Sequence, residues 1–159
     1  MKGGTRVNDN ARCPRIRVAA IIVRNGHILL ARHQRKGARY WVLPGGAVEY
    51  RETLEQALVR ELKEEANLDI TVRDLVMVSD SMPKDLRRHV VDVFFTADVA
   101  GGKLRVGVSD KRLVDMQFVA VERLSRLRLY PNLRRQLLRG IANGFAVIPC
   151  YQGKLYRTG

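Results

Sequence analysis

The chain consists largely of short apolar runs separated by turn residues, a pattern typical of a sheet-rich domain. Residues 17–23 and 27–31 are rich in Val, Ile, Leu and Ala, and they flank Asn25-Gly26, which favours a type I′ turn. We therefore predict a β-hairpin at the start of the domain. Further strands are predicted at residues 40–43, 70–79, 89–98 and 115–121.

Segments rich in Gly, Pro or charge mark the expected turns between these strands. Pro-Gly-Gly at residues 44–46 should end the third strand with a turn, and Gly101-Gly102 should form a turn between the last two strands. Residues 34–39 include three basic residues, and we expect them to form a basic loop.

Two segments have the signals of amphipathic helices. In the first, Thr53 is a good N-cap residue and Gln56 completes a capping box, so the helix should begin at Leu54. Asn67 is the expected stop, which gives a helix over residues 54–66.

The second helix is predicted to begin near Pro131 and to end at Asn143, with four apolar residues facing inward: Leu133, Leu137, Leu138 and Ile141. Together the elements predict a mixed sheet with at least two helices, the α/β (α+β) fold class. We expect one domain over residues 15–144, a flexible arm at residues 1–14, and a tail at residues 145–159 whose structure the sequence leaves open.

Three carboxylates lie on or beside the apolar face of the first helix. At 100° per residue from Leu54, the core residue Leu62 lies at about 80°, Glu61 at about −20° and Glu65 at about 20°. Glu64 lies at about −80°, at the edge of the same sector. Glu-rich helices often expose their charges to solvent, but this angular position favours a functional reason for the carboxylates.

Like charges four residues apart are unfavourable even when exposed, and partial burial raises their cost unless protons or cations neutralise them. A divalent cation would neutralise all three glutamates at once. Oxygen-only ligands at this density favour Mg²⁺, with Mn²⁺ as a second possibility, over Zn²⁺.

Composition narrows the classes of partner. The chain has 159 residues, with 29 Lys and Arg against 16 Asp and Glu, for a formal net charge of +13. Such a charge predicts attraction to polyphosphates, nucleotides or RNA without distinguishing among them. Cys13 and Cys150 are too few for a disulfide framework. No apolar run is long enough to cross a membrane and no signal peptide is evident, so we expect a cytoplasmic protein.

The spacing of the glutamates resembles the Nudix box. Six positions after Gly46 stands Glu52, and eight positions later comes the segment Arg-Glu-Leu-Lys-Glu-Glu-Ala-Asn-Leu at residues 60–68. The family pattern is Gly, five residues, Glu, seven residues, then Arg-Glu-apolar-x-Glu-Glu-x-Gly-apolar. Every specified position matches except Asn67, which replaces a Gly. Asn is the usual second choice in the left-handed conformation that follows a helix, so we expect it to be tolerated.

The resemblance implies a Nudix-like α/β/α sandwich with a central mixed β-sheet and two main helices. It also implies that Glu61, Glu64 and Glu65 hold the metal, helped by the backbone carbonyl of Gly45. The box residues Gly46, Glu52 and Arg60 would then brace the loop and the helix, with Arg60 paired to Glu52.

The implied activity is Mg²⁺-dependent hydrolysis of a diphosphate linkage between a nucleoside diphosphate and another moiety. The general base is open: Glu61 and Glu64 are candidates, and Asp110 is a weaker one ahead of the last strand. Arg32 and Arg39 could contact phosphates, and Trp41 could stack on a base, although a Trp at the start of a strand more often belongs to the core.

The sequence therefore leaves three alternative functions open. The first is a hydrolase of nucleotide sugars such as ADP-ribose, nucleoside triphosphates or dinucleoside polyphosphates. The second is an RNA 5′ pyrophosphohydrolase, which the positive charge favours. The third is a nucleotide-sensing or nucleic-acid-binding module without turnover, which has no need of all three glutamates. A homodimer is compatible with the sequence, which leaves the oligomeric state open.

Overall fold

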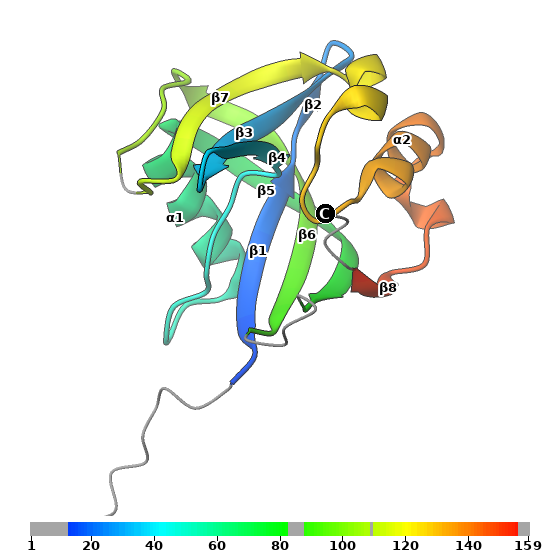
Figure 1. Ribbon diagram of the computed structural model, residues 1–159, viewed down its shortest axis with the longest axis horizontal. Helices are drawn as coiled ribbons and strands as arrows, with labels where there is room; N and C mark the ends of the chain where they lie inside the picture. Colours follow the sequence, from blue (N-terminus) through cyan, green and yellow to red (C-terminus); the bar gives the residue numbers. More distant parts are fainter. Residues whose placement is uncertain (1–12, 83–87, 109, 156–159) are drawn as a thin grey trace, which may run out of the picture.

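A computed structural model of the protein describes residues 13–82, 88–108 and 110–155 (Figure 1). The strands are β1 (Arg15–Ile21), β2 (Val23–Arg24), β3 (His27–Arg35), β4 (Ala38–Val42), β5 (Leu68–Ser81), β6 (Val90–Gly102), β7 (Leu113–Ala120) and β8 (Tyr151–Leu155). The α-helices are α1 (Leu54–Ala66) and α2 (Arg134–Asn143), and the 3₁₀ helices are η1 (Val121–Arg126) and η2 (Phe145–Val147).

The strands form two four-stranded sheets. The first has the order β1-β6-β5-β8 and is mixed, because β1 is parallel to β6, β6 is antiparallel to β5, and β8 is parallel to β5. The second is antiparallel, with β3 between β4 and β7 and with β2 paired to the start of β3. The predicted mixed α/β class with two main helices is confirmed, with the strands divided between two sheets.

The two helices cover opposite faces of the sheets, with α1 on one side and α2 on the other in Figure 1. The alternation of side chains along β1 explains this layering. Val18 packs in one apolar cluster with Leu62 of α1, whereas the next residue, Ala19, packs in a second cluster with Leu137 of α2. All four are fully buried. Strand β1 thus lies at the centre of an α/β/α sandwich, with apolar residues on both faces.

The first helix has the predicted bounds and caps. Thr53 Oγ1 accepts a hydrogen bond from the Gln56 N–H at 3.2 Å, and Gln56 Oε1 accepts one from the Thr53 N–H at 2.8 Å. Asn67 is left-handed, with φ 55° and ψ 33°, and its N–H donates to the carbonyls of Leu62 and Lys63. Asn67 therefore ends α1 as predicted, in the position where the resemblance expected a Gly.

The region predicted as a basic loop at residues 34–39 is instead a tight hairpin. Strands β3 and β4 run to either side of Lys36-Gly37, whose φ angles are 49° and 76°. Two consecutive residues with positive φ form the two-residue turn that suits twisted strands. The loop prediction was wrong because the turn needs only two residues, and the charged residues beside it continue the strands.

Gly101 and Gly102 lie inside the paired end of β6, so the predicted turn is also wrong at this point. They pair with Asp69 and Leu68 of β5. Gly102 has φ 87°, and a Cβ there would lie 2.3 Å from the carbonyl oxygen of Asn67. This glycine therefore permits a close approach of two backbones where β5 leaves α1.

The C-terminal half differs from the prediction in two places. Helix α2 begins at Arg134 rather than near Pro131, because the Leu133 N–H donates to the Pro131 carbonyl in a tight turn before the helix. The tail, which the sequence left open, contributes η2 and the edge strand β8. The predicted arm lies mostly outside the described residues, and the domain bounds stay a prediction.

None of the described helices combines the length and the apolar character that crossing a membrane requires.

Candidate active site

Arg60 joins the loop before α1 to the helix. Its Nη2 and Nε donate to the two carboxylate oxygens of Glu52 at 2.7 and 3.1 Å, and Nη2 also donates to the Ala47 carbonyl at 3.0 Å. Its Nη1 donates to Glu61 Oε1 at 3.0 Å. These bonds lower the pKa of Glu52 and raise that of Arg60. The loop and the first glutamate are therefore positioned by one guanidinium group.

The three box glutamates differ in burial. Glu65 is buried, at 5% exposed, and the Glu61 side chain is mostly buried, whereas about half of the Glu64 side chain is exposed. Burial raises the pKa of Glu65 to about 7 and also raises the pKa of Glu61. This pattern matches the angular positions expected from the sequence. Two carboxylates on the inner side of α1 are thus costly to ionise without a cation.

At Gly45 and Gly46 the backbone passes close to two of these glutamates. The Gly45 N–H donates to Glu65 Oε2 at 3.1 Å. A Cβ on Gly46 would lie 2.2 Å from the carboxylate of Glu61, so a side chain at this position would displace that group. The Gly45 carbonyl, which the resemblance assigned to the metal, accepts a hydrogen bond from Arg17 Nη2 at 3.1 Å. Two of the predicted metal-binding residues, Glu61 and Glu65, therefore lie against this turn.

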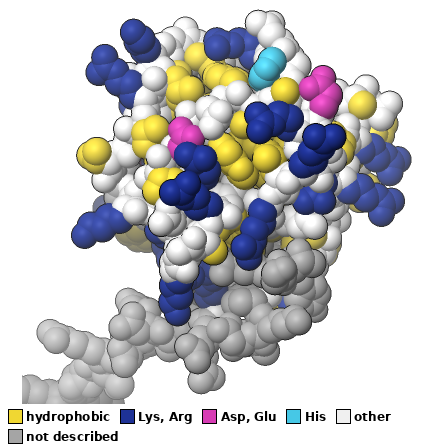
Figure 2. Space-filling view, turned by 45° about the horizontal axis from the view of Figure 1, so that its top comes forward, with side chains coloured by type: hydrophobic (Ala, Val, Ile, Leu, Met, Phe, Trp, Pro, Cys, Tyr) yellow, Lys and Arg dark blue, Asp and Glu magenta, His cyan; other side chains and the backbone are white. Residues whose placement is uncertain are grey.

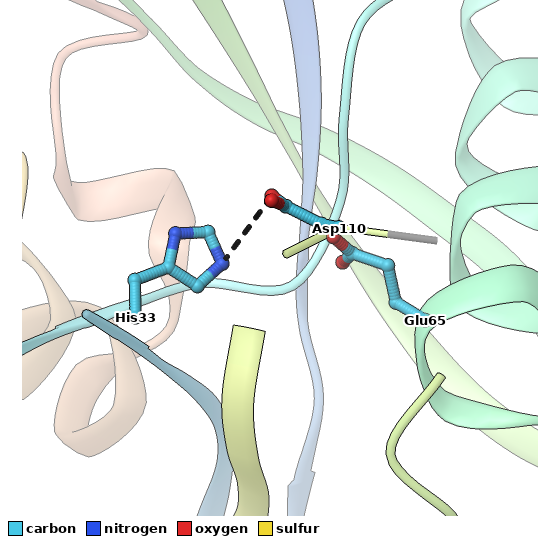
Figure 3. A group of neighbouring side chains, drawn as sticks. All are labelled: His33, Glu65 and Asp110. Carbon is cyan, nitrogen blue, oxygen red and sulfur yellow. Dashed lines mark ion pairs between the residues drawn. The ribbon is translucent and has the colours of Figure 1, made fainter. Parts of the chain in front are cut away.

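Two further side chains lie close to Glu65, one on a strand of the second sheet and one just before another of its strands. His33 on β3 and Asp110, which precedes β7, each place one side-chain atom within 4.8 Å of a Glu65 oxygen and of one another (Figure 3). The distance from His33 Nε2 to Asp110 Oδ2 is 4.0 Å. Asp110 was predicted as a weak catalytic candidate, and His33 was not singled out. The fold thus adds a histidine to the carboxylate group.

The environment of this group is set by burial and by Arg112. Burial lowers the pKa of His33 to about 4, although the nearby Asp110 partly opposes that effect. Burial alone would raise the pKa of Asp110, but hydrogen bonds from Arg112 outweigh it and leave the pKa below its ordinary value. The Arg112 side chain donates to both carboxylate oxygens, at 2.7 to 3.1 Å. His33 is thus neutral and Asp110 ionised near pH 7.

A cavity of about 460 Å³ opens beside the glutamates, a size typical of small-ligand sites. One part of its lining is acidic, with Glu49, Glu61, Glu64, Glu65, Asp92 and Asp110. The remainder is basic, aromatic and apolar, and includes Arg15, Arg17, Arg35, Arg88, Arg112, Tyr40, Tyr130, Ile16, Val42 and Val90. Figure 2 shows many more basic than acidic side chains on the face it presents. The cavity can therefore receive an anionic ligand next to a cluster of carboxylates.

Three predicted substrate-binding residues do not line this cavity. Arg32 pairs with Asp115 at 3.1 Å and lies over the ring of Trp41, its cross-strand partner. Arg39 donates to Gln34 at 3.0 Å on the exposed part of the hairpin. Because side chains alternate along a strand, the neighbouring residues of β3 and β4 face the cavity instead. These are His33, Arg35, Tyr40 and Val42.

The box geometry agrees with a comparison against known families, in which residues 14–140 match the model of the NUDIX domain. The chain belongs to the Nudix hydrolase family. A MutT NUDIX hydrolase from Burkholderia pseudomallei has a similar solved structure, with a TM-score of 0.63 and 33% sequence identity over 70% of this chain and 86% of that one. A NUDIX hydrolase from Nitrosomonas europaea shares the fold at a TM-score of 0.73 and 20% identity.

Two relatives of this Nudix chain are named for hydrolysis of different substrates. An ADP-ribose pyrophosphatase of Methanocaldococcus jannaschii is 38% identical over 117 residues, which cover 72% of this chain and 66% of the relative. An NAD-capped RNA hydrolase of Vibrio atlanticus is 34% identical over 128 residues, which cover 79% of this chain and 45% of the relative. The match thus spans about two thirds of the first relative and less than half of the second.

Proposed function

We propose that this chain is a Mg²⁺-dependent pyrophosphohydrolase that cleaves the diphosphate linkage of a nucleoside diphosphate joined to another moiety. The observation that carries the proposal is the position of Glu61 and Glu65 against the Gly45-Gly46 turn, with Glu64 on the lining of the same cavity of about 460 Å³, which several arginines also line. The carboxylates suit a hard cation, and the basic lining suits the phosphates of a substrate.

The donor set fits a divalent ion. Glu65 is buried, and its pKa of about 7 reflects how poorly the surrounding protein compensates its charge. A cation shared with Glu61 and Glu64 would compensate it, with Mg²⁺ the best match and Mn²⁺ an alternative. When bound, such an ion polarises a phosphoryl oxygen and lowers the pKa of a coordinated water. Glu61, Glu64 and Glu65 would hold it, with the Gly45 carbonyl adjacent.

Other residues of the chain would orient the ligand and the reacting water. Arg15, Arg35 and Arg88 line the cavity and can pair with phosphate oxygens. Asp110 is poorly suited to act as a general base, because the hydrogen bonds from Arg112 hold its pKa below the ordinary value. That leaves Glu61 or Glu64 to accept the proton of the attacking water, with Glu64 the more exposed of the two.

A substrate panel tests the activity. Purified protein with Mg²⁺ is incubated with ADP-ribose, nucleoside triphosphates and dinucleoside polyphosphates, and the phosphorylated products are separated and identified. We expect at least one compound to be cleaved at its diphosphate linkage into two phosphorylated products, and we expect EDTA to abolish cleavage. If no member of the panel and no capped RNA is cleaved, the hydrolase proposal fails and a nucleotide-binding role without turnover replaces it.

A second candidate is hydrolysis at the 5′ end of RNA, which the formal charge of +13 and the similarity to an NAD-capped RNA hydrolase favour. Phosphate contacts of RNA outside the cavity would then supply much of the affinity, and these contacts weaken with salt. The expected signature is a steep loss of kcat/KM for a capped 20-nucleotide RNA between 50 and 200 mM NaCl. Equal salt dependence for the RNA and for the free dinucleotide would exclude this candidate.

A further inference from the structure

His33 is buried, at 8% exposed, on the cavity face of β3, and its imidazole meets carboxylates rather than solvent. Its Nε2 has no hydrogen-bond partner within the part of the chain that the structure describes. A buried polar nitrogen without a partner costs free energy, and such groups usually have a ligand, a water or a function. The nitrogen is directed toward Asp110 and Glu65, as Figure 3 shows.

The spacing of the three side chains is slightly wider than that of the ligands around one metal ion. One atom from each of His33, Glu65 and Asp110 lies within 4.8 Å of the others. In metal sites with ligand distances of about 2.1 Å, opposite ligands are separated by about 4.2 Å, so modest side-chain movements would close this group around one ion. Arg112 fixes the carboxylate of Asp110 while leaving lone pairs on both oxygens for an additional partner.

We propose that His33, Glu65 and Asp110 form a mixed nitrogen–oxygen site for a divalent transition-metal ion, adjacent to the carboxylate-only site of α1 and sharing Glu65 with it. Imidazole favours borderline transition metals, whereas carboxylates alone favour Mg²⁺. The imidazole thus shifts the preference of the site next to α1 from Mg²⁺ toward transition-metal ions, and Mn²⁺ is a paramagnetic member of that series that accepts both oxygen and nitrogen ligands. Because Glu65 is common to both sites, this inference rests on the metal centre of the proposed function.

The site can be tested on the unmodified protein with Mn²⁺ as the probe and without nucleotide. Pulsed electron paramagnetic resonance detects a nitrogen nucleus bonded to Mn²⁺, and oxygen ligands give no such coupling. We expect ¹⁴N coupling in the Mn²⁺-loaded protein, and we expect ¹⁵N-histidine labelling to convert it to the ¹⁵N pattern. Bound Mn²⁺ without nitrogen coupling, or no Mn²⁺ binding at all, overturns the proposal.

Two variants assign the nitrogen to its residue. His33→Gln should abolish the coupling and weaken Mn²⁺ binding at this site at least tenfold, while changing Mg²⁺ affinity less than threefold. His27→Gln is the matched control, because His27 is exposed at the start of the same strand. It should retain full coupling. Coupling that persists in a folded His33→Gln protein overturns the proposal, and if this variant fails to fold, the labelled unmodified protein decides.

The mixed metal site and the proposed hydrolase activity can fail independently of one another. A protein that hydrolyses nucleotides with Mg²⁺ but shows no nitrogen coupling overturns only the mixed site, and a raised KM in His33→Gln would then indicate that the imidazole contacts substrate phosphate. A protein with histidine-coupled Mn²⁺ but no hydrolysis of any substrate supports the mixed site and contradicts the proposed function.

Discussion

Arg60 and Glu52 are joined by two hydrogen bonds, of 2.7 and 3.1 Å, which fix the loop preceding α1 to the helix that carries the glutamates proposed to bind the metal. The same guanidinium also holds Glu61 at 3.0 Å. One residue thus controls both the shape of the turn at Gly46 and the orientation of the first carboxylate. The two-point geometry is specific to Arg, because an ammonium group cannot reproduce the planar fork.

Arg60→Lys should therefore weaken Mg²⁺ binding about tenfold or more, as expected when a residue that orients metal ligands is lost. Isothermal titration with Mg²⁺ measures the effect. The control is Arg73→Lys, which alters the exposed pair of Arg73 with Asp98 and should change neither Mg²⁺ affinity nor stability by more than about 0.5 kcal/mol. Equal Mg²⁺ affinity in both variants would show that the Arg60 brace does not orient the site.

Gly46→Ala should remove activity with little loss of folded protein. The new Cβ would lie 2.2 Å from the carboxylate of Glu61, so this side chain must leave its position. We expect kcat/KM to fall at least about a hundredfold, corresponding to about 3 kcal/mol of transition-state stabilisation. Gly101→Ala is the control, because its nearest contact would be an ordinary 3.4 Å from Asp69. Full activity in Gly46→Ala would mean that Glu61 is dispensable.

The metal-free protein should lose stability as the pH rises, because of Glu65. Its pKa in the folded state is about 7, above the ordinary 4.5, owing mainly to burial. Below the pKa of the unfolded state, the Glu65 carboxyl is protonated in both the folded and the unfolded protein, and its contribution to stability is fully present. As pH rises toward 7 the unfolded chain ionises first, so the folded state loses up to about 3 kcal/mol.

Urea unfolding in EDTA between pH 4.5 and 8 measures this loss, and the difference between the unmodified protein and Glu65→Gln isolates the contribution of one group. Saturating Mg²⁺ should restore much of the stability at pH 8, since a bound ion stabilises the folded state alone. Identical pH profiles for the two proteins in EDTA would contradict the assignment of Glu65 as a buried, uncompensated carboxyl.

Asn67→Ala should destabilise the protein by about 1–2 kcal/mol, because Asn67 has φ 55° and Ala tolerates the left-handed region poorly. Asn67→Gly should stay within about 0.5 kcal/mol of the unmodified protein, since the relief of backbone strain offsets loss of the hydrogen bond from Asn67 Nδ2 to the Lys103 carbonyl. Thermal unfolding compares the two. If Gly were as harmful as Ala, the side-chain bond rather than the backbone conformation would determine this cap.

The first helix and its glutamates were predictable because their signals are local. A capping box, a 3.6-residue period and a left-handed cap all lie within residues 53–67, and the carboxylate positions follow from those residues alone. The fold class followed similarly from the order of the elements. The edge strand β8 did not, because its pairing with β5 joins segments separated by about 70 residues.

The substrate side of the site was predicted less well because it depends on which way β3 and β4 face. Arg32 and Trp41 were selected by residue type, but alternation places His33 and Tyr40 in the cavity. Lys36-Gly37 was the available signal, since a two-residue turn fixes the register of the hairpin. The approach of His33 to Glu65 depends on contacts between distant segments and has no local signature.

We propose that the box carboxylates of α1 hold a catalytic divalent ion, and the most direct test is Mg²⁺-dependent turnover of the best nucleotide substrate by matched glutamine variants. Glu64→Gln and Glu65→Gln should each lower kcat at least about a hundredfold, while Glu55→Gln, on the exposed first turn of the same helix, should keep full activity. Full turnover by both Glu64→Gln and Glu65→Gln would contradict the claim.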